Sequence, residues 1–116
     1  MDGQRKFSRR GIKVPVRWAR EGSERFLAGD YARDISKGGM CLLVREQLEQ
    51  GARIIVEFSL PGPRFILTSV CVIRCEQSTP EEGAVQPLYE VGVEFISIQD
   101  EEGEEIEKFV FASFFT

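Results

Sequence analysis

The sequence predicts a mostly β fold, in which six short antiparallel strands form a small barrel or closed sandwich that one C-terminal α-helix covers. Apolar residues alternate with polar ones along six stretches, as expected for strands with one buried face. Turns containing Gly or Pro separate several of these stretches. Near the C-terminus the apolar residues change to helical spacing, and the strands offer the only surface on which such a helix can bury its apolar face.

Six strands are expected between residues 13 and 95. The clearest spans residues 53–60, where every second residue from Ile54 onward is apolar. A Pro-Gly-Pro segment then makes a hairpin turn, whereas residues 77–87 form a long hairpin loop. The predicted strands are residues 13–19, 26–35, 40–44, 53–60, 65–75 and 89–95.

A C-terminal helix follows the last strand. Ser97 and Asp100 resemble a capping box, which makes Ser97 the expected N-cap. Acidic residues between positions 100 and 105 suit the positive end of the helix dipole. The apolar residues at helical spacing are Ile106, Phe109, Val110 and Phe114.

Length and composition indicate one globular domain. The chain has 116 residues, of which 42% are apolar and 29% are charged, as in ordinary globular proteins. No apolar run approaches the roughly 20 residues that a membrane-spanning helix needs. The basic N-terminus also lacks the apolar stretch of a secretory signal. We therefore expect a cytoplasmic protein without membrane insertion.

The absence of histidine excludes several kinds of active site, among them catalytic triads, histidine-bound zinc and histidine general bases. The three cysteines, Cys41, Cys71 and Cys75, are too few and badly spaced for a closed zinc site. Cys71 and Cys75 are expected on one face of a strand about 13 Å apart, too far for a disulfide. The sequence therefore predicts neither an enzyme nor a metal site.

The net charge of −4 hides a strong asymmetry along the chain. Residues 1–20 carry seven Lys or Arg against one Asp, whereas residues 76–116 carry eleven Asp or Glu against one Lys. A basic N-terminal segment on an acidic chain indicates an anionic partner that binds locally, although a solvated basic tail has the same composition. The predicted organisation is a flexible basic arm over residues 1–12 and a barrel with its helix over residues 13–116.

Two short motifs carry the functional prediction. Arg5 and Arg9 form an RxxxR pattern in the arm, and residues 34–39 read DISKGG at the junction of two predicted strands. In a chain of this composition, RxxxR is expected about once by chance, whereas DxSxxG is expected only about 0.03 times. The second motif is therefore by far the more informative.

Together with the predicted barrel and the strand at residues 89–95, these motifs resemble those of the PilZ domain family. Members of that family carry RxxxR followed, a few tens of residues later, by DxSxxG. The resemblance covers nearly the whole chain and implies a six-stranded antiparallel β-barrel with a C-terminal helix. It also implies a bacterial receptor for the second messenger cyclic di-GMP, with no resident cofactor.

The resemblance and the chemistry of the ligand assign roles to the motif residues. Cyclic di-GMP offers two phosphates and two guanines, and arginine can address both through its fork or by stacking. Arg5 and Arg9 would therefore close over the ligand from the arm. Asp34 would accept hydrogen bonds from guanine N1 and N2, and the Ser36 hydroxyl would bond phosphate or the loop backbone.

Three further residues belong to the predicted site. Gly38 and Gly39 would permit positive φ and let backbone N–H groups approach the ligand. The alternative for this segment is an Asx-type turn that only joins two strands. Gln4 precedes RxxxR, where the residue in this family influences whether one nucleotide or a stacked pair is bound. Because Gln4 is uncharged, we expect one nucleotide per chain.

The predicted function is a cyclic di-GMP receptor whose arm orders on ligand binding and so changes a surface that a separate protein partner reads. Self-association into a homodimer is a second possible output. One alternative is a PilZ-like protein–protein interaction module that binds no nucleotide, against which the intact motifs argue. The other is a nucleic-acid-binding barrel, which the basic arm suits but the acidic C-terminal third does not, so no nucleic-acid partner is expected.

Overall fold

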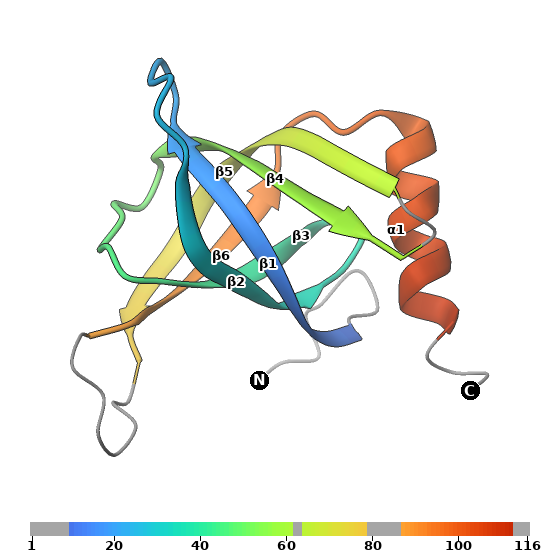
Figure 1. Cartoon of the computed structure of the whole chain (residues 1–116), viewed down its shortest axis with the longest axis horizontal. Coiled ribbons are helices and arrows are strands. Elements are labelled where there is room, and N and C mark those ends of the chain that lie inside the picture. Colours follow the sequence, from blue (N-terminus) through green and yellow to red (C-terminus); the bar gives the residue numbers. More distant parts are fainter. Residues whose placement is uncertain (1–9, 62–63, 79–86, 113–116) are drawn as a thin grey trace.

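The computed structural model describes residues 10–61, 64–78 and 87–112, which form six strands followed by one helix (Figure 1). Strands β4 and β6 have the predicted bounds, whereas β1 begins three residues earlier than predicted. The elements are β1 (Arg10–Arg20), β2 (Leu27–Ile35), β3 (Gly39–Val44), β4 (Arg53–Leu60), β5 (Arg64–Gln77), β6 (Tyr89–Phe95) and α1 (Asp100–Ala112).

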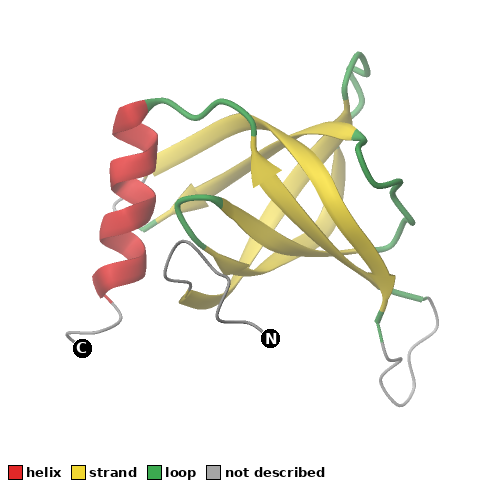
Figure 2. Ribbon diagram, turned by 180° about the vertical axis from the view of Figure 1, so that it is seen from behind, coloured by secondary structure: helices red, strands yellow, loops and turns green. Residues whose placement is uncertain are grey.

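The strands form a closed antiparallel barrel in the order β1-β2-β3-β6-β5-β4 (Figure 2). This topology confirms the predicted six-stranded barrel with a C-terminal helix. β1 pairs with β2 from Arg10 to Trp18 and with β4 from Arg17 to Arg20, so the two ladders overlap only near Trp18. Where β1 and β4 are not paired, a hollow of about 440 Å³ lies between them, lined among others by Val14, Pro15 and Phe58.

The early start of β1 places residues 10–12, assigned to the arm by the sequence, in the barrel wall. Arg10 is paired with Ile35 on β2, so this part of the chain is held by the ladder of a neighbouring strand. The rest of the predicted arm, residues 1–9, lies outside the described residues.

The apolar core fills the barrel interior. Trp18, Ile35 and Met40 are fully buried there, together with the alternating inward residues of the other strands. Helix α1 lies along one side of the barrel in both ribbon views and buries Ile106 and Val110 in the same core (Figures 1 and 2). In the part of the chain that the structure describes, no helix has the length and apolar character required to cross a membrane.

Strand β5 contains a β-bulge between Val72 and Arg74, where two of its residues oppose one residue of β6. Up to Val72, every second residue from Ile66 onward is buried. Beyond the bulge the alternation is reset, so that Arg74 is exposed and Cys75 packs against the core. The prediction that Cys71 and Cys75 share a face is therefore wrong, because the extra residue turns them to opposite faces.

Helix α1 begins later than the capping-box prediction placed it. The Gln99 N–H donates to Glu102 Oε1 (3.4 Å), and the Gly103 N–H donates to the Gln99 carbonyl (2.9 Å). Gln99 therefore occupies the N-cap position. Ser97 stays on the barrel wall, where its carbonyl accepts a hydrogen bond from Thr68 Oγ1 (3.1 Å).

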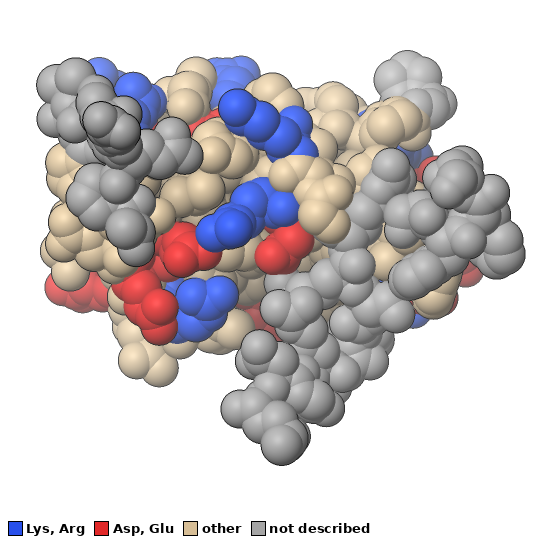
Figure 3. Space-filling model, turned by 90° about the horizontal axis from the view of Figure 1, so that it is seen from below, with Lys and Arg blue, Asp and Glu red and all other residues tan. Residues whose placement is uncertain are grey.

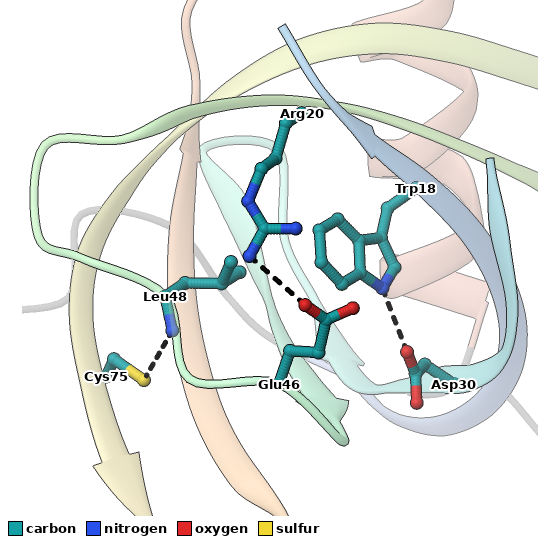
Figure 4. Close-up of polar contacts among 6 residues, drawn as sticks. All are labelled: Trp18, Arg20, Asp30, Glu46, Leu48 and Cys75. Carbon is teal, nitrogen blue, oxygen red and sulfur yellow. Dashed lines mark hydrogen bonds and ion pairs between the residues drawn. The ribbon is translucent and has the colours of Figure 1, made fainter. Parts of the chain in front are cut away.

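A buried carboxylate, Asp30, joins β1, β2 and the segment after β3. Its side chain is 3% exposed. Trp18 Nε1 donates to Asp30 Oδ2 (2.8 Å), and Arg45 Nε donates to Asp30 Oδ1 (3.2 Å). Figure 4 shows the indole nitrogen of Trp18 pointing at Asp30, while Arg20 lies beside the ring and pairs with Glu46 (3.2 Å). These contacts fix Trp18 in the core.

Candidate functional site

The DxSxxG segment joins β2 to β3 as an internally bonded turn. The Ser36 N–H donates to the Gly39 carbonyl (2.8 Å), and the Gly39 N–H donates back to the Ser36 carbonyl (3.4 Å). Ser36 is 2% exposed, and its Oγ accepts a hydrogen bond from the Gly38 N–H (3.2 Å). Ser36 thus shapes the turn through its hydroxyl. Asp34 precedes it, half-buried at the end of β2.

Gly39 in this turn serves close packing, and neither glycine of the turn has a left-handed backbone. Positive φ was expected at Gly38 and Gly39, but neither residue has it. A Cβ at Gly39 would lie 2.0 Å from the Val93 carbonyl oxygen, so β3 approaches β6 at a distance that only glycine allows. The Gly38 carbonyl accepts a hydrogen bond from the Phe95 N–H (3.0 Å), which ties the turn to the end of β6.

The start of β1 lies directly beside this turn. Gly11 is paired with Asp34, and Arg10 is paired with Ile35. Because Arg9 is bonded to Arg10, the segment that carries RxxxR joins the barrel next to DxSxxG. Of the predicted site residues, the structure brings together Asp34, Ser36, Gly38 and Gly39, whereas Gln4, Arg5 and Arg9 lie outside the described residues.

A row of paired residues runs from Asp34 across the barrel wall. Asp34 on β2 is paired with Cys41 on β3. Cys41 is paired with Gly92 on β6, and Gly92 with Arg74 on β5. Since neighbouring strands lie about 4.8 Å apart, the three spacings place Arg74 about 14 Å from Asp34. The barrel therefore brings an arginine that is remote in sequence onto the same face as the motif.

Cys41 lies at the centre of this row and responds to the charges around it. The residue is 3% exposed, and this burial raises the pKa of its thiol. Asp34 raises the pKa further, Arg74 lowers it, and Glu90 and Arg33 act in opposite directions. The thiol is therefore protonated at neutral pH and is not a nucleophile. Its neighbours make the row a mixed, charged environment.

Acidic and basic side chains alternate on this side of the molecule. Arg33 on β2 forms an ion pair with Glu90 on β6, which bridges the intervening strand β3. Figure 3 views the molecule from the side on which β1 starts and shows Lys and Arg next to Asp and Glu, with no large field of one sign. Among the described residues, this face therefore carries a mixture of single positive and negative side chains and no extended patch of one sign.

A hollow of about 650 Å³ lies beside the row, on the outer wall of β1, β2 and β3. Gly11, Lys13, Tyr31, Arg33 and Leu43 contribute to its lining. Lys13 Nζ lies 5.0 Å from the centroid of the Tyr31 ring. The hollow has the size of a small-molecule pocket. Lys13 and the aromatic ring suit an anionic ligand with flat rings, whereas Arg33 is paired with Glu90.

Lys37, inside the turn, connects the site to helix α1. Its Nζ pairs with Glu107 Oε2 (3.1 Å). The side chain also lies against Gly103, where a Cβ would be 3.5 Å from Lys37 Cε. Lys37 is thus a side-chain contact between the turn and α1.

Sequence reasoning missed Arg33, Gly92 and Arg74. Gly92 did carry a signal, since a glycine inside a strand marks a bulge or a close approach of another group. Arg74 carried none, because its position on the outer face depends on the bulge that precedes it.

Comparison with known proteins identifies relatives of the whole chain. The family model described as "PilZ domain" matches residues 3–112. No curated protein sequence matches the chain. Among solved structures, the Bacillus subtilis inhibitor of motility, MotI/DgrA, is similar with a TM-score of 0.79 and 15% identity over 97% of this chain.

Two further solved structures contain cyclic di-GMP. The PilZ domain of YcgR from Escherichia coli has a TM-score of 0.74 and 14% identity, with 94% of this chain and 90% of that chain covered. MrkH of K. pneumoniae, described elsewhere as a transcription regulatory factor, has a TM-score of 0.75 and 16% identity over 97% of this chain. The chain covers 52% of MotI/DgrA and 52% of MrkH, about half of their length. At these identities the likeness establishes the fold.

Proposed function

Because this chain belongs to the PilZ domain family, we propose that it is a receptor for cyclic di-GMP. The observation that carries the proposal is the pairing of Gly11 with Asp34, which supports a single site built from both motifs. The structures of YcgR and MrkH with cyclic di-GMP support the same ligand class. No catalytic step is part of this function.

The proposed binding mode uses the chemistry of each motif. Arg5 and Arg9 neutralise the two phosphates of the ligand or stack on its bases from the arm. Asp34 accepts hydrogen bonds from guanine N1 and N2. Ser36 and the glycines hold the turn that presents Asp34, in keeping with their hydrogen bonds to one another. Binding of one nucleotide per chain remains our expectation, since Gln4 adds no cation for a second.

The proposed output is a change of surface. In the absence of nucleotide the arm samples many positions, and capture of the ligand by Arg5 and Arg9 selects those in which it lies over the barrel. A separate cytoplasmic protein, or a second copy of the chain, then binds the altered surface. Contact of Lys37 with Glu107 offers a route by which the turn also affects helix α1.

We expect Arg5→Ala and Arg9→Ala each to weaken cyclic di-GMP binding about ten- to a hundred-fold. Each change removes charge-assisted hydrogen bonds worth roughly 1.5–3 kcal/mol. Isothermal titration calorimetry of the full chain measures the effect. Arg25→Ala is the matched control, because Arg25 is an exposed arginine in the β1–β2 connection and is not part of either motif.

The same titration separates the alternatives. Binding of a single-stranded oligonucleotide in place of cyclic di-GMP would indicate a nucleic-acid-binding barrel, and binding of neither would indicate a module for protein contacts alone. If Arg5→Ala or Arg9→Ala lowered the melting temperature sharply while binding survived, the arginines would be structural and their assigned roles wrong.

Asp34→Ala is expected to weaken cyclic di-GMP much more than cyclic di-AMP. Guanine presents N1–H and N2 donors that a carboxylate accepts, and adenine has no such pair. Competition titrations with both nucleotides against wild type and variant measure the difference. Equal losses for the two ligands would mean that Asp34 only shapes the turn.

A further inference from the structure

We propose that Arg74 is a further specificity-determining residue of this site, which donates its guanidinium fork to the O6 and N7 acceptors of a bound guanine. The inference rests on the proposed function, because it needs a guanine nucleotide beside Asp34. It assigns ligand recognition to β5, an element that carries neither motif. Three features of the barrel support it: a bulge, a glycine and an uncompensated charge.

The bulge decides which way Arg74 points. Before it, the residues Ile66, Thr68, Val70 and Val72 are all buried. An uninterrupted strand would continue this alternation and turn Arg74 toward the core. The extra residue between Val72 and Arg74 turns the arginine to the outer face instead. Bulges of this kind re-aim side chains next to functional sites.

Gly92 leaves room for the arginine to lie across β6. A Cβ at this position would be 3.0 Å from Arg74 Cγ and 3.1 Å from Arg74 Nε. The side chain therefore follows the row of paired residues toward Cys41 and Asp34. A larger residue at Gly92 would lift Arg74 away from the barrel wall.

The charge of Arg74 is available to a ligand. Among the described residues no ion pair involves Arg74, and the residue is exposed. Arg33 on the same side differs, because Glu90 neutralises it. Both Asp34 and Arg74 influence the thiol of Cys41, which places the two charges around one point of the wall.

The spacing of the two groups suits a purine. Asp34 and Arg74 are three strand spacings apart, about 14 Å between backbones, and the long arginine side chain extends toward Asp34 across β6. A guanine held between them would offer N1–H and N2–H to the carboxylate. Its O6 and N7 would face the guanidinium, the pairing that arginine makes with guanine elsewhere. Asp34 and Arg74 would thus read two different edges of one base.

Arg74→Ala tests the proposal against Arg53→Ala, an exposed arginine on neighbouring β4 whose removal changes the net charge equally. In calorimetric titrations, Arg74→Ala is expected to weaken cyclic di-GMP about ten-fold or more, and Arg53→Ala less than about two-fold. Arg74→Lys, which keeps the charge and loses the fork, should recover only a small part of the loss. Unchanged binding by Arg74→Ala, or full recovery by lysine, would overturn the base-reading role.

Gly92→Ala provides an independent test of the path across β6. We expect weaker binding with a nearly unchanged melting temperature, because the three atoms nearest to the new methyl group all belong to the flexible Arg74 side chain. In the Arg74→Ala background, Gly92→Ala should cause no further loss, and additive losses would contradict the proposal. If the wild-type chain binds cyclic di-GMP, and Arg5→Ala weakens that binding whereas Arg74→Ala does not, the proposed role of Arg74 fails and the proposed function stands. If wild type does not bind cyclic di-GMP, the proposed function fails with it.

Discussion

Gly39→Ala is expected to lower the melting temperature of the barrel by about 10 °C or more. The new methyl carbon would lie 2.0 Å from the Val93 carbonyl oxygen and 3.1 Å from Glu94 Cα, both atoms of the β6 backbone. Backbone cannot rotate away as a side chain does, so β3 and β6 must separate. Overpacking of this kind costs about 3 kcal/mol or more, and each kcal/mol lowers the melting temperature of a domain of this size by about 4 °C.

Gly11→Ala is the matched control for this change. Gly11 is also a barrel glycine without positive φ, but a Cβ there would meet no atom of the described residues within 4 Å. Its substitution should leave the melting temperature unchanged or raise it slightly, since alanine restricts the unfolded chain. Thermal unfolding followed by circular dichroism compares the two variants. Equal melting temperatures would show that β3 and β6 are not in close contact at Gly39.

Asp30→Ala has the next largest expected effect, a loss of about 2–4 kcal/mol in the free energy of unfolding. The substitution leaves the indole N–H of the fully buried Trp18 without its acceptor and removes the anion that Arg45 faces. An unpaired buried donor costs its full desolvation, and half of a broken ion pair adds to this. Arg45 is half exposed, which keeps the estimate below that for a fully buried pair. Urea denaturation measures the change.

Two further variants, Glu46→Ala and Asp30→Asn, serve as controls for Asp30→Ala. Glu46→Ala removes a carboxylate from a neighbouring ion pair with Arg20, but both side chains are about half exposed (52% and 45%). Its cost should stay below about 1 kcal/mol. Asp30→Asn retains an acceptor for the Trp18 N–H and should be intermediate. If Asp30→Ala were no more destabilising than Glu46→Ala, the buried carboxylate would not hold Trp18 in place.

The strands that sequence predicts well are those whose alternation is regular. Strands β4 and β6 have the predicted bounds, because apolar residues alternate without interruption and Gly or Pro residues lie near them. β5 was predicted in its place but not in its geometry. A bulge depends on how a strand registers against its partner, and β5 pairs with β4 and β6. The sequence of β5 alone does not contain that register.

The candidate site likewise has one part that the sequence predicts and one part that it does not. Asp34, Ser36 and Gly39 form a local motif, and local hydrogen bonds build the turn, so the sequence predicts the turn that they make. The expected positive φ at Gly39 is nevertheless wrong, because the residue is a glycine for its contact with Val93, which is remote in sequence. Approach of its N–H to a ligand stays a prediction. Arg74 lies on the same face as Asp34 through the pairing of β5, β6 and β3, which only the closed barrel defines.

The pairing of β1 with β2 and β4 also determines where the barrel opens most easily by local fluctuation. From Arg10 to Val16 the strand has one ladder of cross-strand hydrogen bonds, to β2, whereas Trp18 is paired with both β2 and β4, and residues 19–20 pair with β4 alone. Opening of residues 10–16 breaks pairs with β2 alone, so their amides should exchange with solvent through smaller fluctuations than those around Trp18, which is held on both sides. Residues 5–9 are attached to this singly paired part of β1. A nucleotide bound between the arm and the turn would hold this part of β1 against the barrel. Part of its binding free energy would then be used to reduce the local opening of β1.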